Sequence, residues 1–251
     1  MEWAFPEAGA AARQVRLMSG ASLRELVPRC VRVSERRHDH DPEPLYPEEA
    51  AHISRAVVKR RREFTTVRRC AREALGELGL GRPPMVPGEA GSPTWPDGVV
   101  GSMTHCAGYR AAAVALASDV CAVGIDAEPN ERMPAGVLGA VASEAEAERL
   151  RLLLASRPGT AWDRLLFSAK ESVYKAWFPL TRQWLGFEEA DVVIDPSGGF
   201  RAALARPLAL GSGRETWELA GRWSCDANHL MTSIVLLAAE GTEASHSSGT
   251  A

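Results

Sequence analysis

The segment VGIDAEP (123–129) places two carboxylates two residues apart at the end of an apolar stretch. The apolar stretch predicts a strand. Alternate residues of a strand share one face, so Asp126 and Glu128 are expected to lie side by side. Two adjacent carboxylates repel each other unless a cation lies between them, and hard oxygen ligands suit Mg2+. Taken alone, the motif fits a polar strand end in solvent equally well.

A second group of charged residues lies on a predicted helix, FSAKESVYKAW (167–177). Glu171 and Lys175 are four residues apart and therefore share one face, while Lys170 points elsewhere. An ordinary surface ion pair would have the same spacing. The aromatic residues of the segment predict a largely buried helix, however, and a charged pair without a function is costly to bury. Only three of the 29 basic residues are Lys, and Lys, unlike Arg, can release a proton at accessible pH.

Two further segments could bind phosphate. GSMTHC (101–106) carries Ser102 and His105, although a single His is more often structural than functional. Residues 55–72 predict a helix with eight basic residues and one acid. On an ideal helix Arg60 and Arg68 lie about 80° apart, and the Arg fork suits phosphate oxygens. A solvated charged face and a nucleic-acid surface are the alternatives for this helix.

Hydrophobic periodicity predicts the elements that must position these residues. Helical patterns cover 47–79, 144–155 and 160–178, with Pro47 in the first turn of one helix and Ser143 as the N-cap of another. A short helix fits 134–141, and a short helix or turn that enters a strand fits 22–34. Loops rich in polar residues, Pro or Gly are predicted at 35–46 and 81–98. Strands are predicted at 99–104, 109–117, 120–127, 189–195, 200–205, 215–225 and 229–238.

The sequence contains a faint internal repeat. GSMTHCAGYRAAAVAL (101–116) and GRWSCDANHLMTSIVL (221–236) each predict a strand, a polar turn and an apolar strand, and each follows a long helix. Hairpins are common, so the repeat is weak on its own, but two similar α+β halves would explain it. The expected organisation is a flexible extension over 1–21, halves over 22–118 and 119–239, and a disordered tail over 240–251.

Together the motifs resemble those of the Sfp-type 4′-phosphopantetheinyl transferases. That family carries GS-x-[ST]-H, GID-x-E and F-[SC]-x-KE-x-x-x-K in this order, matched here by GSMTHC, GIDAEP and FSAKESVYK. The flanks KRRREFTTVRRCAR, TWPDGVVGSMTHCAGYR and KAWFPLTRQWLGFEEA are similar to the EntD-like, actinobacterial branch. The resemblance spans about residues 22–238. It implies a pseudo-twofold α+β fold with coenzyme A between the halves. The implied reaction attaches phosphopantetheine to a serine of an acyl or peptidyl carrier protein and releases 3′,5′-ADP.

The resemblance also implies roles for the residues singled out above. Asp126, Glu128 and Glu171 would arrange Mg2+, with Mn2+ as an alternative, on the coenzyme A pyrophosphate. Glu171 is the expected base for the carrier serine, and Lys175 would stabilise or protonate the leaving oxygen. The residues expected to bind coenzyme A are Arg60 and Arg68, at the 3′-phosphorylated adenosine end, Ser102 and His105, on phosphate oxygens, and Lys175. His105 thus joins Asp126, Glu171 and Lys175 in the catalytic set.

Two further features concern the binding of the 3′-phosphate and of the carrier protein. Many relatives carry a basic residue in the loop before GS-x-[ST]-H, whereas residues 85–96 (MVPGEAGSPTWP) contain none, which leaves open how the 3′-phosphate is held. Trp177, Phe178, Arg182 and Trp184 are candidate contacts for the carrier protein, because aromatic and Arg side chains dominate interface energies. The alternative is that Trp177 and Phe178 belong to the core.

Composition limits the other functions. The net charge of −3 favours neither nucleic acid nor an anionic membrane, the apolar runs are shorter than the ~20 residues of a membrane helix, and the first residues lack a signal-peptide pattern. Five scattered Cys without a CxxC pair predict neither a zinc site nor a disulfide framework and fit a reduced cytoplasm. A monomer is expected because one chain supplies both halves. The remaining alternatives are a non-catalytic coenzyme A-binding regulatory module, a nucleic-acid-binding protein and a metal-dependent phosphohydrolase.

Overall fold

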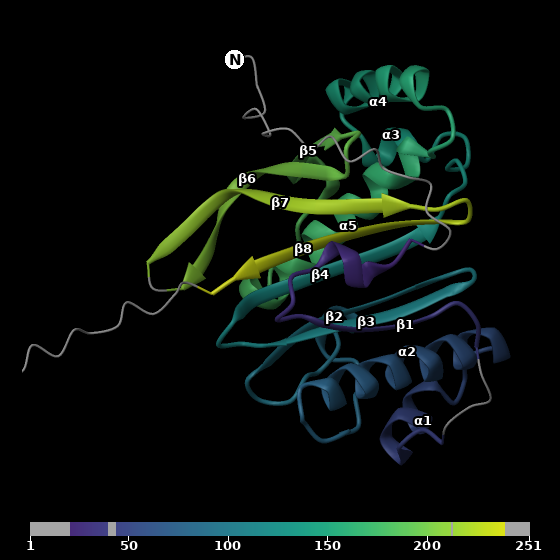
Figure 1. The fold of residues 1–251 in the computed structure, drawn as a ribbon, viewed down its shortest axis with the longest axis vertical. Coiled ribbons are helices and arrows are strands. Elements are labelled where there is room, and N and C mark those ends of the chain that lie inside the picture. Colours follow the sequence, from purple (N-terminus) through teal and green to yellow (C-terminus); the bar gives the residue numbers. More distant parts are fainter. Residues whose placement is uncertain (1–20, 40–43, 212, 239–251) are drawn as a thin grey trace, which may run out of the picture.

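The computed structural model describes residues 21–39, 44–211 and 213–238. They form two antiparallel sheets, each packed against a long helix (Figure 1). The α+β class expected from the sequence is therefore confirmed. The predicted tail at 240–251 lies outside the described residues, as does the predicted N-terminal extension apart from Ala21. No helix within the described ranges is long and apolar enough to cross a membrane.

The first sheet has the strand order β1-β3-β2. Its strands are β1 (Arg32–Arg36), β2 (Val99–Cys106) and β3 (Tyr109–Leu116). Helix α2 (Val58–Glu77) packs on this sheet through small side chains, which allow the helix to approach closely: Cys70, Ala71, Ala74, Ala112 and Val114. Three short elements complete this part of the chain: η1 (Leu23–Leu26), α1 (Pro47–Ile53) and η2 (Glu89–Gly91).

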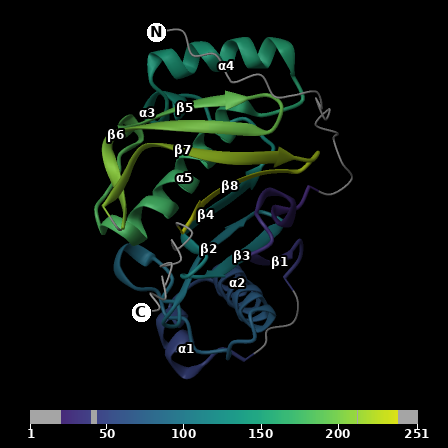
Figure 2. The same cartoon turned by 60° about the vertical axis from the view of Figure 1, so that its left-hand side comes forward.

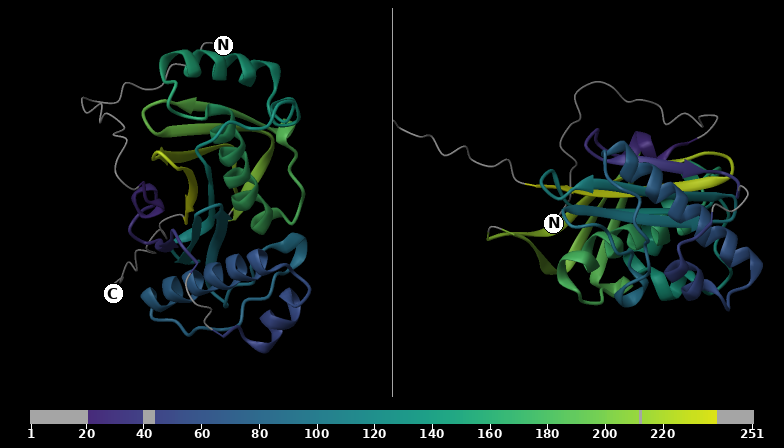
Figure 3. Two further views of the ribbon diagram at one scale, coloured as in Figure 1. Left: turned by 90° about the vertical axis from the view of Figure 1, so that its right-hand side faces the viewer. Right: turned by 90° about the horizontal axis from the view of Figure 1, so that it is seen from below.

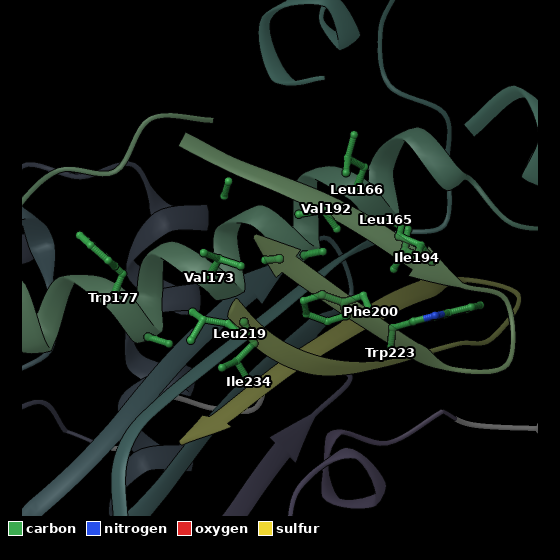
Figure 4. Close-up of a cluster of buried hydrophobic side chains, with 14 of the residues drawn as sticks. Leu165, Leu166, Val173, Trp177, Val192, Ile194, Phe200, Leu219, Trp223 and Ile234 are labelled. Atoms are coloured by element: carbon green, nitrogen blue, oxygen red, sulfur yellow. The ribbon is translucent and has the colours of Figure 1, made fainter. Parts of the chain in front are cut away.

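The second sheet has the order β4-β8-β7-β6-β5. Its strands are β4 (Val120–Pro129), β5 (Ala190–Asp195), β6 (Gly199–Gly211), β7 (Arg214–Cys225) and β8 (His229–Leu237). Its helical elements are α3 (Leu138–Val141), α4 (Glu144–Ser156), α5 (Trp162–Thr181) and η3 (Phe187–Glu189). Helix α5 lies on one face of the sheet (Figure 2). The apolar face of α5 meets side chains of the sheet in the largest core (Figure 4), which includes Leu165, Val173, Trp177, Phe200, Leu219 and Ile234.

The two sheets share one topology. In the first, β1 pairs with β3, the last strand of its half, and β3 pairs with β2, the strand before it. In the second, β4 pairs with β8, and β8 pairs with β7 in the same way, while β5 and β6 extend the sheet beyond β7. The long helix of each half precedes its last hairpin. The faint repeat in the sequence therefore corresponds to a repeated arrangement of strands.

The sheets meet where β2 lies beside β4, and side chains rather than a backbone ladder join these two described strands. The hydroxyl of Ser102 accepts a hydrogen bond from the Ile125 amide, and the hydroxyl of Thr104 accepts one from the Ala127 amide, both at 3.1 Å. The two bonds advance in the same direction along both strands, so β2 and β4 run parallel. We call this contact, formed by Ser102, Thr104, Ile125 and Ala127, the β2–β4 seam.

Most predicted elements are confirmed within a few residues, but the helical pattern predicted over 47–79 is two helices. Residues 54–57 separate α1 from α2, and Val57 is extended, with φ −62° and ψ 156°. The Arg61 side chain donates hydrogen bonds to the Ser54 and Ala56 carbonyls, so these groups need no helical partner. Strand β6 also continues to Gly211, beyond the predicted end at 205, because a register shift between Ala203 and Leu208 lets the pairing resume after Pro207.

Candidate active site

A cleft of about 650 Å³ lies between the two halves and is lined by α2, residues 87–95, β2 and α5. In the left view of Figure 3 the green helix α5 descends toward the blue helix α2. Six of the predicted site residues line the cleft: Arg60, Arg68, Ser102, His105, Glu171 and Lys175. Asp126 and Glu128 do not line it, but Asp126 is in direct contact with Lys175. The structure thus brings together motifs that lie more than one hundred residues apart in the sequence.

Gly124, in the GID motif, sets the distance between β4 and α5. A Cβ atom at this position would lie 2.1 Å from the Ser172 carbonyl oxygen and 2.9 Å from the Ala176 amide nitrogen. Only a residue without a side chain allows the helix to approach the strand so closely. This approach brings the Lys175 ammonium group to 2.7 Å from Oδ1 of Asp126 and 3.2 Å from the Ile125 carbonyl oxygen.

Asp126 is 4% exposed, and its two oxygens have different surroundings. Oδ1 accepts hydrogen bonds from Lys175 and from the Thr104 hydroxyl, the latter at 3.1 Å. Oδ2 is buried and has no hydrogen-bond partner among the described residues. A buried carboxylate oxygen without a partner is costly, so this atom is suited to a cation or a water molecule.

The other two predicted metal ligands are partly buried carboxylates. Burial, and then the neighbouring charge of Asp126, raise the pKa of Glu128 to about 7, although Arg164 contacts it at 3.3 Å. Burial also raises the pKa of Glu171, while the nearby Lys175 opposes the rise. A cation among the three carboxylates would reverse these shifts. The residues present therefore fit a cation whose other ligands come from a substrate or water.

Within the described part of the chain, no three His, Cys, Asp or Glu side chains are close enough to form a metal site by themselves. Mg2+ usually keeps several waters and takes only one or two carboxylates together with substrate phosphates. A Mg2+ site that is completed by a bound phosphate compound agrees both with the absence of a three-ligand cluster among the described residues and with the ligands that Mg2+ prefers. The metal assignment therefore depends on a ligand that brings oxygens into the cleft.

On the opposite side of the cleft lie three basic residues, which we call the basic wall: Arg60, Arg68 and His105. Arg60 donates a hydrogen bond to Nε2 of His105, and Glu63 lies 3.6 Å from the same nitrogen. Burial, and then the charge of Arg60, lower the pKa of His105, so the imidazole is neutral at neutral pH. Arg68 is 6% exposed, stacks on the Phe64 ring and donates to the Met85 carbonyl at 3.0 Å. Burial lowers the pKa of Arg68 to about 10, which leaves it cationic at neutral pH.

The sequence did not reveal the role of the hydroxyl groups on β2. Ser102, expected only at a phosphate, is 3% exposed and accepts the Ile125 amide. A serine hydroxyl can accept that bond and still donate its own hydrogen. Thr104 was not singled out, yet it bonds both Asp126 and the amide of Ala127. The available signal was the two-residue spacing of Ser102 and Thr104, which places both hydroxyls on one face of the strand.

Several residues that looked chemical in the sequence are structural. Lys170 is 3% exposed, pairs with Glu146 at 2.8 Å and donates to the Phe187 carbonyl at 2.7 Å, which fixes α5 to α4 and η3. Trp177 and Phe178 are buried, which confirms the alternative that they belong to the core. Trp184, by contrast, is 70% exposed. All five cysteines are free thiols.

Comparison with known proteins agrees with this arrangement. Residues 48–115 match the 4′-phosphopantetheinyl transferase N-terminal domain, and residues 122–226 match the 4′-phosphopantetheinyl transferase superfamily. The 4′-phosphopantetheinyl transferase Svp of Streptomyces mobaraensis is 55% identical over 79% of this chain and 81% of its own. PptT of Mycobacterium tuberculosis is 50% identical over 76% and 85%, and Npt of Nocardia iowensis is 44% identical over 77% and 90%. The chain therefore belongs to the 4′-phosphopantetheinyl transferase superfamily and is a transferase that moves the phosphopantetheine arm of coenzyme A onto carrier proteins.

Proposed function

We propose that Asp126, Glu128 and Glu171 hold Mg2+, with Mn2+ as an alternative, together with pyrophosphate oxygens of coenzyme A. The observation that carries this proposal is the buried Oδ2 atom of Asp126, which has no hydrogen-bond partner among the described residues. The raised pKa values of Glu128 and Glu171 support it, because burial and the neighbouring Asp126 charge disfavour the ionised carboxylates, which a cation would stabilise. When bound, the cation would neutralise the charge that develops on the pyrophosphate.

In this proposal Glu171 and Lys175 handle the protons of the reaction. The carrier serine hydroxyl attacks the β-phosphate, its proton passes to the Glu171 carboxylate directly or through water, and 3′,5′-ADP leaves. A bound cation would lower the pKa of Glu171 again, which keeps the carboxylate ionised and able to accept the proton. Lys175, held by Asp126 at 2.7 Å, is placed to stabilise or protonate the leaving oxygen.

The basic wall of the cleft would bind the nucleotide end of coenzyme A. Arg60 and Arg68 lie two turns apart on α2 and both line the cleft, and Arg forks suit phosphate oxygens. His105 and Ser102 would contact phosphate oxygens nearer the carboxylates. Because residues 85–96 contain no basic residue, the α2 arginines are the proposed partners of the 3′-phosphate.

The expected partners and organisation stay predictions. The substrates are proposed to be acyl and peptidyl carrier domains of fatty-acid, polyketide or nonribosomal-peptide synthases. The halves are proposed to be 22–118 and 119–239, with a monomer as the working unit in the cytoplasm and neither nucleic acid nor a membrane as a partner. Trp184 is the strongest of the predicted carrier contacts, because its ring is largely exposed beside the C-terminal end of α5.

The experiment that tests this proposal is intact-mass spectrometry of an apo carrier protein incubated with the enzyme and coenzyme A. We expect the carrier to gain one phosphopantetheine arm with Mg2+ and none with EDTA. Full transfer with EDTA would contradict the metal assignment while leaving the reaction in place. Cleavage of coenzyme A without a carrier would favour the phosphohydrolase alternative, and binding without transfer would favour the regulatory module, which none of the comparisons supports.

A further inference from the structure

We infer that His229 is a positioning residue for coenzyme A binding, which holds the β2–β3 turn so that His105 faces the cleft. The inference rests on the proposed contact between His105 and a phosphate of coenzyme A. His229 is the first residue of β8, far from the carboxylates in sequence, and is 6% exposed. It belongs to none of the three motifs of the active site.

The hydrogen bonds of the His229 ring determine its tautomer. Arg37 lies 3.2 Å from Nδ1, and Nε2 lies 2.9 Å from the Ala107 carbonyl oxygen. Because a guanidinium group can only donate, Nδ1 must accept from Arg37. The hydrogen of the neutral ring is then on Nε2, which donates it to Ala107. The ring thus bridges a cation and a carbonyl group with both nitrogens in use.

Asp226 fixes the orientation of this bridge. Its Oδ1 accepts hydrogen bonds from the Asn228 and His229 amides, both at 2.8 Å, which closes the β7–β8 turn. Its Oδ2 lies 2.8 Å from Arg37, and Arg37 also donates to the Ala21 carbonyl at 2.7 Å. We call Arg37, Asp226, His229 and Ala107 the His229 clamp. It connects the residues after β1 and the β2–β3 turn to the last hairpin of the other half.

The turn that the clamp holds contains a glycine, which lets the His229 ring approach closely. Gly108 adopts φ +75°, and a Cβ atom there would lie 3.2 Å from Nε2 of His229. Ala107 is two residues from His105, so a change in the position of the Ala107 carbonyl also moves the end of β2. Figure 1 shows the β2–β3 and β7–β8 turns at the same end of the molecule.

The position of β2 relative to β4 depends on few bonds. No backbone ladder joins the two described strands, and the β2–β4 seam supplies two hydroxyl–amide bonds, the second at Thr104. Among the described residues beyond Thr104, the next hydrogen bond from the end of β2 to the second half is the one between Ala107 and His229. His105 itself stays paired with Arg110 in the β2–β3 ladder and bonded to Arg60, so loss of the clamp is expected to shift the end of this hairpin, and His105 with it, while leaving Asp126 and Lys175 in place.

The test uses the full chain and compares His229→Leu with His229→Gln. Leu keeps the volume of the ring and removes its hydrogen bonds, whereas the Gln amide can still donate to Ala107. We expect His229→Leu to raise the Kd for coenzyme A, measured by calorimetry, by about threefold to tenfold, as for a lost hydrogen bond. We expect KM for coenzyme A to rise in parallel, kcat to change less than twofold, and His229→Gln to restore most of the affinity. Ala227→Gln, in the exposed part of the same turn, serves as the control and should behave as wild type.

A double-mutant cycle with His105→Ala separates this inference from the proposed function. If His229 acts through His105, then His229→Leu has no further effect on Kd once His105 is Ala. An additive effect overturns the inference and leaves the role of His105 intact. An unchanged Kd in His105→Ala alone contradicts the proposed phosphate contact and removes the basis of the inference as well. If His229→Leu does not fold, Arg37→Met, in which the side chain replaced is about a third exposed, tests the same coupling with the same expected outcomes.

Discussion

The ammonium group of Lys175 lies 2.7 Å from Oδ1 of Asp126, and this ion pair links the two motifs that carry the chemistry. The spacing of Glu171 and Lys175 on one helix face suggested that these two would interact, but the ion pair of Lys175 crosses from α5 to β4. Lys175 is therefore oriented by the strand that carries two of the proposed metal ligands.

Asp126→Asn is expected to abolish most of the turnover. The amide keeps the shape of the side chain and removes the negative charge that Lys175 and the proposed cation require, so kcat should fall by about 100-fold or more. The Kd for coenzyme A should change much less, because the basic wall is untouched. Asp119→Asn, in the exposed turn just before the same strand, is the control. Turnover near wild type at ordinary Mg2+ concentration would overturn the metal assignment.

Lys175 can be tested by separating its charge from its proton. Lys175→Met should lower kcat strongly, because the buried Asp126 carboxylate loses its ion-pair partner. Lys175→Arg keeps the charge but cannot release a proton at accessible pH, so it should lower kcat and change the alkaline side of the pH profile. The measurement is kcat against pH for both variants. Full activity of Lys175→Arg with an unchanged profile would mean that charge alone is sufficient.

The Thr104 hydroxyl is expected to contribute both to stability and to catalysis. Thr104→Val keeps the volume but leaves the buried Ala127 amide without its acceptor, a loss of about 1–3 kcal/mol. A chain of this size should lose roughly 2–4 °C in Tm for each kcal/mol. Thr104→Val also removes a hydrogen-bond donor to Asp126, so kcat should fall as well. Thr104→Ser restores the hydroxyl, and its failure to recover activity would argue against the assigned bonds.

Gly124→Ala should destabilise the whole chain. The new methyl group would overlap the Ser172 carbonyl, so α5 must move away from β4, at an expected cost of about 3 kcal/mol or more. Thermal denaturation followed by circular dichroism measures the effect. Gly139→Ala is the matched control, because a Cβ atom in α3 would contact nothing within 4 Å. Equal Tm values for the two variants would show that the close approach of α5 has been overestimated.

Binding of coenzyme A is expected to take up a proton at His105. Burial and Arg60 lower the pKa of His105 in the free enzyme, whereas a bound phosphate would raise it. Titration calorimetry at about pH 6, close to the ordinary pKa of His, in buffers with different ionisation enthalpies measures the uptake. The His105→Gln variant corrects for protons exchanged by the phosphates themselves. Identical proton uptake in both proteins would exclude His105 from the phosphate site.

The lowered pKa of His105 also predicts how the stability of the folded chain changes with pH. The unfolded chain binds a proton at His105 more readily than the folded chain does. This group therefore leaves stability unchanged well above pH 6.5 and lowers it as the pH falls below that value. His105→Gln should reduce the fall in Tm between pH 7 and pH 5, as long as the variant folds normally. A steeper fall in the variant would mean that the imidazole is charged in the folded state.

Much of the fold could be predicted because local patterns dominate it. The 3.6-residue period of α5 and the N-cap at Ser143 each appear in the sequence and in the structure. The break between α1 and α2 could not be predicted, since it depends on where the Arg61 side chain finds its acceptors. The repeated order of strands could only be suspected, because pairing joins residues far apart in the chain.

The sequence predicted which residues form the site better than it predicted which of them contact each other. Motif order selected the carboxylates and Lys175, but the contact between Lys175 and Asp126 joins residues 49 positions apart. Thr104 and His229 were missed for the same reason, since each acts on a group brought near it only by the fold. Lys170, by contrast, looked reactive from its rarity, and its burial against Glu146 gives it a structural role.

The β2–β4 seam has a consequence for how the molecule changes shape. A backbone ladder keeps neighbouring strands about 4.8 Å apart along their whole length, whereas two hydroxyl bridges constrain only the points where they occur. We therefore expect deformation to follow the floor of the cleft, where these bridges and the packed side chains behind them join the two sheets, while each sheet keeps its own geometry. A substrate that contacts α2 on one side and α5 on the other would then connect the two sheets across the β2–β4 seam. The enzyme would gain rigidity at the moment of binding, in the region where chemistry requires it.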